Sequence, residues 1–210
     1  MKTVTFILAM LMTLSVSGQN YQSGSRKSSS EKVYTLSKKQ NENLKKAAMS
    51  KVARFQENCK LIGSKDIPYS DKTCTGGYID VAMQDFLDGA RIEITSIDGK
   101  TSSSKKVKRY LLNLSLLNYK EIHIESYNCA MVGNFVKDAN MSRQTGQEWY
   151  VGEVTVYQKF NAVTHEGRII SDTVKRTMKV YATMNQIFGA DGRVDTWWDI
   201  KLDDITAKNV

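Results

Sequence analysis

Three side chains suited to acid–base chemistry alternate along one segment rich in β-forming residues. His123, Glu125 and Tyr127 are spaced two residues apart, so they point to the same side of an extended chain. In a pocket they would supply a base, an acid and a hydrogen-bond donor for proton abstraction or dehydration. Ile122 and Ile124 lie on the other side of the same strand, which is therefore the apolar side. This arrangement favours exposure of the three polar residues to solvent. Both interpretations stay open, and the sequence establishes no catalytic residue.

The chain has three cysteines and two histidines, which leaves little room for a metal site. Cys59 and Cys74 are 15 residues apart, and a disulfide between them would stabilise the fold by about 3 kcal/mol in an oxidising compartment. The alternative is that Cys59 is a small apolar residue on the buried face of a helix. If Cys59 and Cys74 are bridged, Cys129 is left without a partner cysteine. No Cys/His spacing fits zinc and no nucleotide-binding or hydrolase motif occurs, so we expect neither a metal nor a cofactor.

Three aromatic residues are candidates for a ligand site. Trp149, Trp198 and Tyr110 would stack on or enclose a small ligand. Trp197 precedes Trp198 in a strand, so the two must face opposite sides of the sheet. The alternative is that these aromatic side chains belong to the core and to an interface.

The positive charge of the chain is concentrated near its N-terminus. The formal net charge is +8, and residues 19–60 hold ten basic and three acidic residues, whereas residues 61–210 are neutral overall. An anionic partner is therefore expected at the first helix, where the candidate contacts are Lys38, Lys39, Lys45, Lys46, Lys51 and Arg54. The alternative is an ordinary solvated helix face.

Residues 1–18 have the pattern of a signal peptide. Lys2 forms a short positive region, residues 4–14 are almost wholly apolar, and Gly18 provides a small residue at the cleavage site. We therefore expect a secreted or periplasmic protein, which disfavours nucleic acid as a partner. Residues 19–40 are predicted to be a basic flexible arm with the start of the first helix, and residues 41–210 a single domain.

The rest of the chain predicts helices first and long strands afterwards. A helix is expected from Lys32 to Ile62, ended by Gly63, because Leu44, Ala48, Val52, Phe55, Cys59 and Ile62 recur at helical spacing. A loop over 63–77, a short helix over 78–87 and a strand over 90–97 follow. A Ser run, 102–104, provides N-cap candidates for a helix over 107–117. Four long strands complete the chain, with hairpin turns at 164–167 and 189–192.

This order predicts an α+β fold. A long N-terminal helix and two shorter helices are expected to pack on one face of a curved antiparallel sheet of four to six strands. The connections between the last four strands are short, so these strands should be antiparallel neighbours. Asp80 and Asp85 on the short helix are candidates for a pocket acid, but carboxylates on helix surfaces are usually solvated, and we expect the same here.

The element order resembles the nuclear transport factor 2-like superfamily, the cystatin-like α+β cone. The resemblance lies in the helix over 43–62, the helix-to-strand phrase over 81–94 and the terminal strand over 197–202. It implies a pocket between the concave sheet and the helices, pairing of two copies through the sheet in many members, and members without catalytic activity. The Asp or Asp–His pair that its enzymes use cannot be placed on any residue here.

Three functions remain open at this point. The first is a non-catalytic module that binds a small apolar ligand or a protein partner, with a basic arm on an anionic envelope surface. The second is a pocket enzyme of isomerase or dehydratase type. The third is a homodimeric structural component of the cell envelope. The exposure of His123 and Glu125 distinguishes the second from the others.

Overall fold

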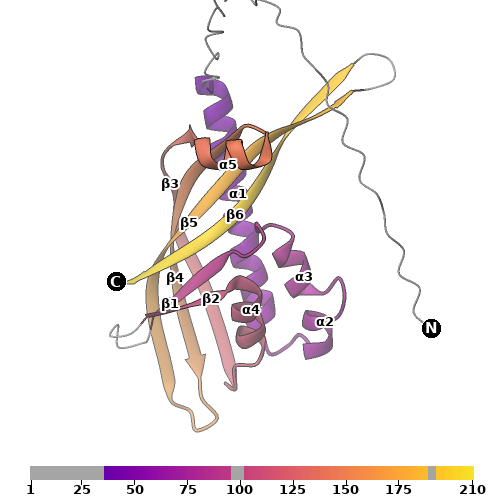
Figure 1. The fold of residues 1–210 in the computed structure, drawn as a ribbon. Helices are drawn as coiled ribbons and strands as arrows, with labels where there is room; N and C mark the ends of the chain where they lie inside the picture. The colour runs from indigo at the N-terminus through magenta and orange to yellow at the C-terminus, as the bar shows by residue number, and fades with distance from the viewer. Residues whose placement is uncertain (1–35, 96–101, 189–192) are drawn as a thin grey trace, which may run out of the picture. The chain divides into compact units, whose positions relative to one another are not determined.

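The computed structural model describes residues 36–95, 102–188 and 193–210, and these form one compact α+β unit (Figure 1). The predicted signal peptide and the turn at 189–192 lie outside the described residues, as does most of the predicted basic arm. The helices are α1 (Lys38–Gly63), α2 (Tyr69–Thr73), α3 (Tyr78–Met83), α4 (Val107–Ser115) and α5 (Ala139–Thr145). The strands are β1 (Arg91–Thr95), β2 (Ser102–Lys106), β3 (Glu121–Lys137), β4 (Trp149–Val163), β5 (Ile169–Phe188) and β6 (Val194–Asn209).

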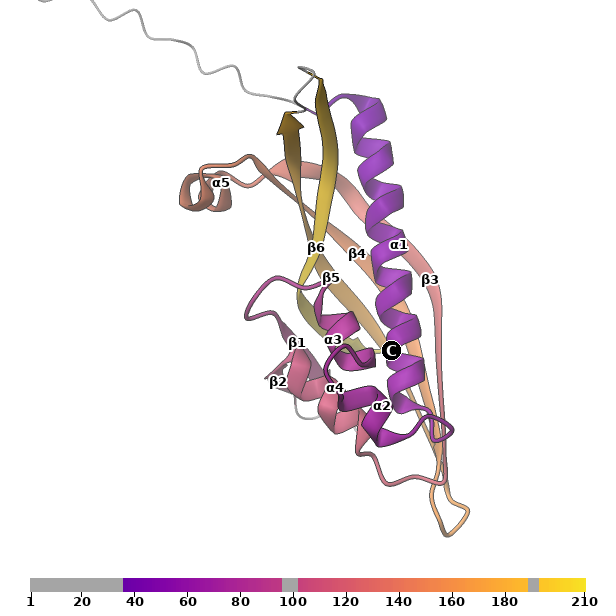
Figure 2. The same cartoon turned by 90° about the vertical axis from the view of Figure 1, so that its right-hand side faces the viewer.

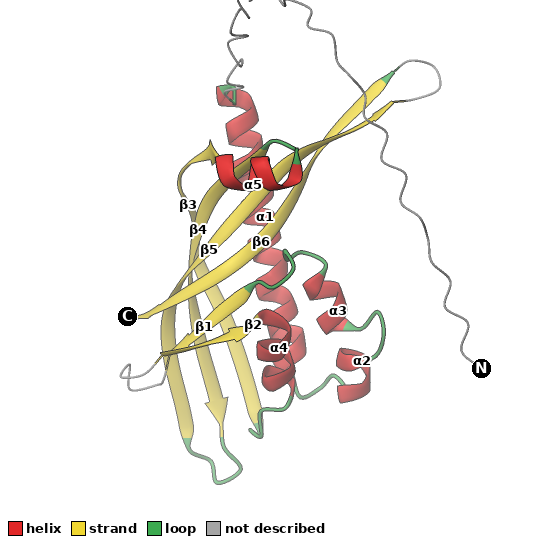
Figure 3. Cartoon of the chain, viewed as in Figure 1, coloured by secondary structure: helices red, strands yellow, loops and turns green. Residues whose placement is uncertain are grey.

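The six strands form one mixed sheet in the order β2-β1-β6-β5-β4-β3 (Figure 3). Strands β3 to β6 are antiparallel neighbours, which confirms the prediction for the last four strands. The prediction of a wholly antiparallel sheet is wrong, because β1 pairs in parallel with β6 through Ile92 and Ile205. Most of the chain separates these two strands, so no hairpin fixes their relative direction.

Helix α1 buries the apolar residues that were predicted to form one face of it. Its six apolar residues from Leu44 to Ile62 are all buried, and they join side chains of α3, α4 and the strands in one hydrophobic core. Figure 2 shows α1 along the sheet with α3 and α4 beside its C-terminal half, and α5 apart from them. None of the described helices is both long and apolar enough to cross a membrane.

The ends of α1 differ from the prediction. The helix begins at Lys38 rather than Lys32, because Ser37 and Gln40 form a capping box in which each side chain bonds the other's backbone N–H. Gly63 is the last helical residue and not a left-handed stop. A Cβ there would lie 3.2 Å from the Ile124 side chain, so the glycine allows α1 to approach β3 closely.

Two segments expected to be irregular are regular. The predicted loop over 63–77 contains the short helix α2. The Ser run does not cap α4, because it lies in strand β2 and pairs with β1 across Glu93–Ser104 and Ile94–Ser103. Lys106 is the N-cap residue instead and makes no side-chain capping bond.

Candidate ligand-binding cavity

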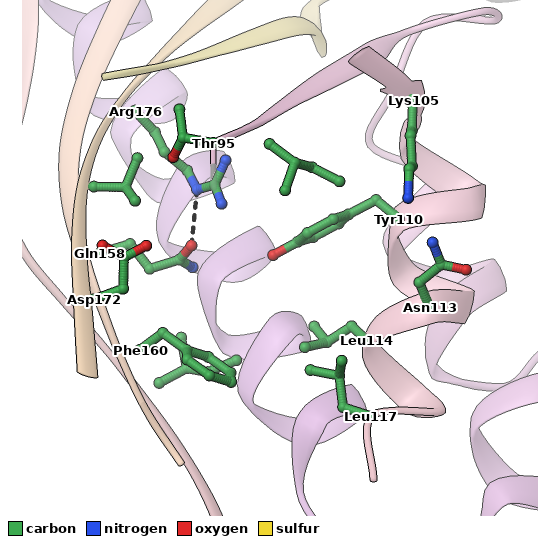
Figure 4. Close-up of a pocket in the computed structure, with 13 residues that line it drawn as sticks. Thr95, Lys105, Tyr110, Asn113, Leu114, Leu117, Gln158, Phe160, Asp172 and Arg176 are labelled. Carbon is green, nitrogen blue, oxygen red and sulfur yellow. Dashed lines mark hydrogen bonds between the residues drawn. The ribbon is translucent and has the colours of Figure 1, made fainter. Parts of the chain in front are cut away.

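A cavity of about 310 Å³ lies between α4 and the sheet (Figure 4). This volume is at the lower end of the range found for small-molecule sites. Helix α4 and the turn after it contribute one wall, β1 and β2 a second, and β3 to β5 the floor. The lining residues are Ile94, Thr95, Lys105, Tyr110, Asn113, Leu114, Leu117, Ile124, Gln158, Phe160, Asp172, Val174 and Arg176.

The periodicity of each element places these side chains together. Tyr110, Leu114 and Leu117 lie on one face of α4 and its continuation, at helical spacing. On β5, Asp172, Val174 and Arg176 alternate with residues of the other face, so all three point at the cavity. The same rule places Gln158 and Phe160 side by side on β4.

Arg176 is the buried charge of the cavity, with 7% of its surface exposed. Its Nε donates to Oε1 of Gln158 at 2.7 Å, and its Nη1 donates to the backbone carbonyl of Glu93 at 3.2 Å. The guanidinium carbon lies 5.7 Å from the centre of the Tyr110 ring, a cation–π distance. No carboxylate of the described residues lies within ion-pairing distance of Arg176.

A chain of buried amides holds the orientation of Arg176. Nε2 of Gln158 donates to Oε1 of Gln56 on α1 at 2.7 Å, and the Ser126 hydroxyl donates to the same oxygen at 2.8 Å. Gln158 therefore accepts from the guanidinium with one end of its amide and donates to α1 with the other. This arrangement fixes which way the Gln158 amide points and holds the guanidinium over the cavity.

Two hydroxyl groups also belong to the polar part of the lining, which further includes Lys105, Asn113 and Asp172. Burial raises the pKa of the Tyr110 phenol to about 12, against a smaller opposing effect of the Arg176 charge, so the phenol is neutral at ordinary pH. The Thr95 hydroxyl is buried and has no hydrogen-bond partner within the described ranges. Such an unpaired buried hydroxyl is uncommon in a folded protein.

The predicted acid–base residues lie outside this cavity. The side chain of His123 is 68% exposed and lies 3.9 Å from Glu121, and Glu125 is also exposed. Tyr127 stacks on Tyr157 of the neighbouring strand, with ring centres 5.6 Å apart. Their neighbours Ile122 and Ile124 face inward, as the alternation predicted.

The three aromatic candidates have different environments. Tyr110 lines the cavity, but Trp149 and Trp198 do not. The Trp149 indole N–H donates to the Thr145 hydroxyl at 2.8 Å and so fastens α5 to β4. Trp198 packs edge-to-face on Tyr150, 5.8 Å between ring centres, and contacts the core.

The predicted polyanion contacts divide into two groups along α1. Lys51 and Arg54 both form ion pairs with Asp85, with 2.7 Å between the Lys51 nitrogen and the carboxylate. The expectation that Asp85 is solvated is wrong, because only 1% of it is exposed. Lys45 pairs with Glu42. Lys38, Lys39 and Lys46 are exposed and form no ion pair with any described residue.

The cysteines are free thiols in the structure. Cys59 is buried in the core, and burial raises its pKa to about 12, whereas Cys74 is exposed. The structure therefore does not contain the disulfide that the sequence left open. Cys129 is also free, on the exposed side of β3. Across the described ranges, no cluster of His, Cys, Asp and Glu is suited to a metal ion.

Sequence reasoning missed the polar residues that matter most in the cavity. Arg176, Thr95, Gln158 and Asp172 were not among the candidates. The alternation of β5 did place Arg176 on the same face as Val174, Met178 and Val180. An arginine in the middle of an apolar strand face is the signal that would have identified it.

No protein-family model matches the chain, and no curated protein matches it in sequence. Among solved structures, the chain is similar to the Kfla4162 protein from Kribbella flavida, with 11% sequence identity and a TM-score of 0.42. This similarity covers 80% of the present chain and 93% of that chain. It assigns neither a family nor a function to the chain.

Proposed function

We propose that this chain is a secreted or periplasmic, non-catalytic module of the nuclear transport factor 2-like type that holds a small, mainly apolar ligand. The observation that carries the proposal is the cavity between α4 and the sheet. Seven of its thirteen lining residues are aliphatic or aromatic and six are polar or charged. Apolar walls with polar groups at defined positions are usual in a small-molecule site. The exposure of His123 and Glu125 supports a binding role over proton-transfer chemistry at β3.

Two adjacent leucines provide a test of the cavity. Leu117 lines it, whereas Leu116 is 60% exposed and is absent from the lining. We expect 1-octanol to shift amide resonances of cavity residues in the full chain, and Leu117→Trp to weaken binding at least tenfold by filling the space. Leu116→Trp is the matched control and should leave binding unchanged. Absence of cavity shifts with 1-octanol and with the neutral dye N-phenyl-1-naphthylamine would overturn the proposal.

A second part of the proposal concerns the N-terminal half of α1. Lys38, Lys39 and Lys46 are exposed cations without a counter-ion on the described part of the chain, and this supports contact with an anionic surface. Near such a membrane surface each lysine contributes about 1 kcal/mol. Replacing these three by Glu should abolish co-sedimentation with phosphatidylglycerol vesicles at low salt.

The matched control replaces three exposed lysines elsewhere, namely Lys120, Lys179 and Lys208. These residues carry the same total charge but lie outside α1. Equal loss of vesicle binding in both triple variants would show that net charge acts without any contribution from the position of the lysines. Binding that 0.3 M salt leaves unchanged would exclude an electrostatic contact.

A further inference from the structure

Three hydrogen-bonding groups of the cavity find no partner in the described part of the protein. The first is Nη2 of Arg176, because the interactions of this side chain use only Nε and Nη1. The second is the buried hydroxyl of Thr95. The third is the hydroxyl of Tyr110, which stays protonated because burial raises its pKa to about 12. All three residues line the same cavity.

These groups surround one end of the cavity. The backbone carbonyl of Glu93 accepts a hydrogen bond from Nη1 of Arg176. Thr95 lies two residues after Glu93 on β1, so the carbonyl and the Thr95 side chain both approach the guanidinium from this strand. The Tyr110 ring lies 5.7 Å from the guanidinium carbon, and Figure 4 shows it reaching from α4 towards the strand residues. A guanidinium buried to this extent requires a counter-ion or a full set of acceptors, and the described residues provide two acceptors.

The other end of the cavity is apolar. Leu114 and Leu117 come from the α4 side, Ile124 from β3 and Phe160 from β4. Asn113 lies beside Leu114 on the α4 wall, and the four apolar side chains of this end favour a hydrocarbon chain or ring. A ligand that satisfies both ends carries an anionic head and an apolar tail.

We propose that the cavity binds a small monocarboxylic acid, with its carboxylate on Arg176 and Thr95 and its hydrocarbon part against Phe160 and Leu117. The inference rests on the proposed ligand-binding function and names the ligand class. Nη2 and the remaining N–H of Nη1 present a fork that matches a planar carboxylate, and charge-assisted hydrogen bonds of this kind are about twice as strong as neutral ones. The lining carries Lys105, Arg176 and Asp172, a net charge of +1, which matches a monoanion better than a phosphate dianion.

Asp172 is the group that opposes this proposal. It lies four residues before Arg176 on the same face of β5 and would attract an ammonium group instead. The two residues do not form an ion pair with one another. A cationic amphiphile is therefore the competing ligand class, and the test includes it.

Three probes with the same eight-carbon chain distinguish these possibilities: octanoate, 1-octanol and octylammonium. Binding to the full chain is measured by titration calorimetry at pH 7 and by shifts of cavity amide resonances. We expect octanoate to bind at least tenfold more tightly than 1-octanol and octylammonium. Equal affinity of octanoate and 1-octanol, or tightest binding of octylammonium, would overturn the carboxylate proposal while leaving the ligand-binding function intact. Binding of none of the three would reject the function itself.

Variants separate the contribution of Arg176 from general charge. Arg176→Met should remove the preference for octanoate over 1-octanol, whereas Lys179→Met, on the exposed face of the same strand, should not alter it. If Arg176→Met does not fold, two other variants still test the proposal. Thr95→Val should weaken octanoate binding several-fold, and Asp172→Asn should strengthen it. Unchanged octanoate affinity in both would count against the assigned carboxylate position.

Discussion

Asp85 and Arg176 are charged side chains buried to a similar degree, yet only Asp85 has a counter-ion in the described part of the protein. The Asp85 carboxylate forms ion pairs with Lys51 and Arg54 of α1. The backbone carbonyl of Asp85 accepts a hydrogen bond from the backbone N–H of Leu202 on β6 at 2.7 Å. Arg176 is held by one amide and one carbonyl. A buried charge that is paired with opposite charges holds secondary-structure elements together. A buried charge without a counter-ion still has hydrogen-bonding groups that a ligand can use.

Among the substitutions that test this difference, Asp85→Asn has the largest expected effect on the free energy of unfolding. Loss of the buried negative charge removes the charge-assisted bonds that hold α1 to the segment before β1. The free energy of unfolding should fall by about 2 to 3 kcal/mol, because the partly exposed Lys51 and Arg54 regain water. Urea unfolding followed by circular dichroism measures the change. Glu57→Gln, which breaks the exposed pair with Lys60 on the same helix, should cost under about 0.5 kcal/mol. Similar losses in both variants would contradict the structural role assigned to Asp85.

Tyr110, which lies beside Arg176, should make the free energy of unfolding depend on pH. Burial raises the phenol's pKa in the folded protein to about 12, from the ordinary value of 10.0. The unfolded chain therefore loses this proton first, and the free energy of unfolding falls as the pH rises between these two values. The loss attributable to Tyr110 should reach up to about 3 kcal/mol, because the shift is about two pKa units and one unit corresponds to about 1.4 kcal/mol.

The measurement compares the wild type with Tyr110→Phe in urea at pH 9 to 12. The variant should lose less stability over this interval than the wild type. The Cys59 thiol, whose pKa is also raised to about 12 by burial, is present in both proteins and adds to the rise of the Tyr110 pKa. The difference between the two curves therefore measures the phenol together with its interaction with Cys59. Parallel curves would mean that the phenol is solvated and does not face a closed cavity.

Thr95→Val has a smaller effect of the opposite sign. The unpaired hydroxyl is replaced by a methyl group of the same shape, so the ligand-free protein should gain about 1 kcal/mol. Thr183 is the matched control, because its buried hydroxyl donates to the carbonyl of Glu148 at 2.9 Å. Thr183→Val should lose about 1 kcal/mol. Destabilisation by both substitutions, measured as urea midpoints, would show that Thr95 has a hydrogen-bond partner in solution.

The sequence predicted the apolar part of this molecule better than its polar part. The stripe of α1 and the alternation of β3 were correct because helical and extended periodicities translate directly into buried faces. The parallel pairing of β1 with β6 was not predictable, since it joins residues more than a hundred positions apart. The Ser run was assigned to a cap because serine commonly caps helices, but tertiary pairing with β1 prevailed.

Of the ligand-binding candidates that the sequence offers, only Tyr110 lines the cavity. His123 and Glu125 are close in sequence and therefore easy to recognise as a pair, whereas the polar end of the cavity combines residues of β1, α4, β4 and β5. Asp85 was assigned to solvent because carboxylates on helices are usually exposed. Its burial depends on two cations that lie more than thirty residues earlier in the chain, and no local pattern reveals that proximity.

His123→Gln combined with Glu125→Gln gives the smallest expected effect. Both side chains are exposed, and His123 lies 3.9 Å from Glu121, so water screens the interactions that the double substitution removes. The free energy of unfolding should change by less than about 0.5 kcal/mol, and affinity for 1-octanol and octanoate should stay the same. Urea unfolding and calorimetry measure these two quantities. A tenfold loss of affinity in this double variant would move the ligand site from the cavity to the outer face of β3. Retained affinity here, together with its loss in Leu117→Trp, would assign binding to the side of the sheet that α4 covers.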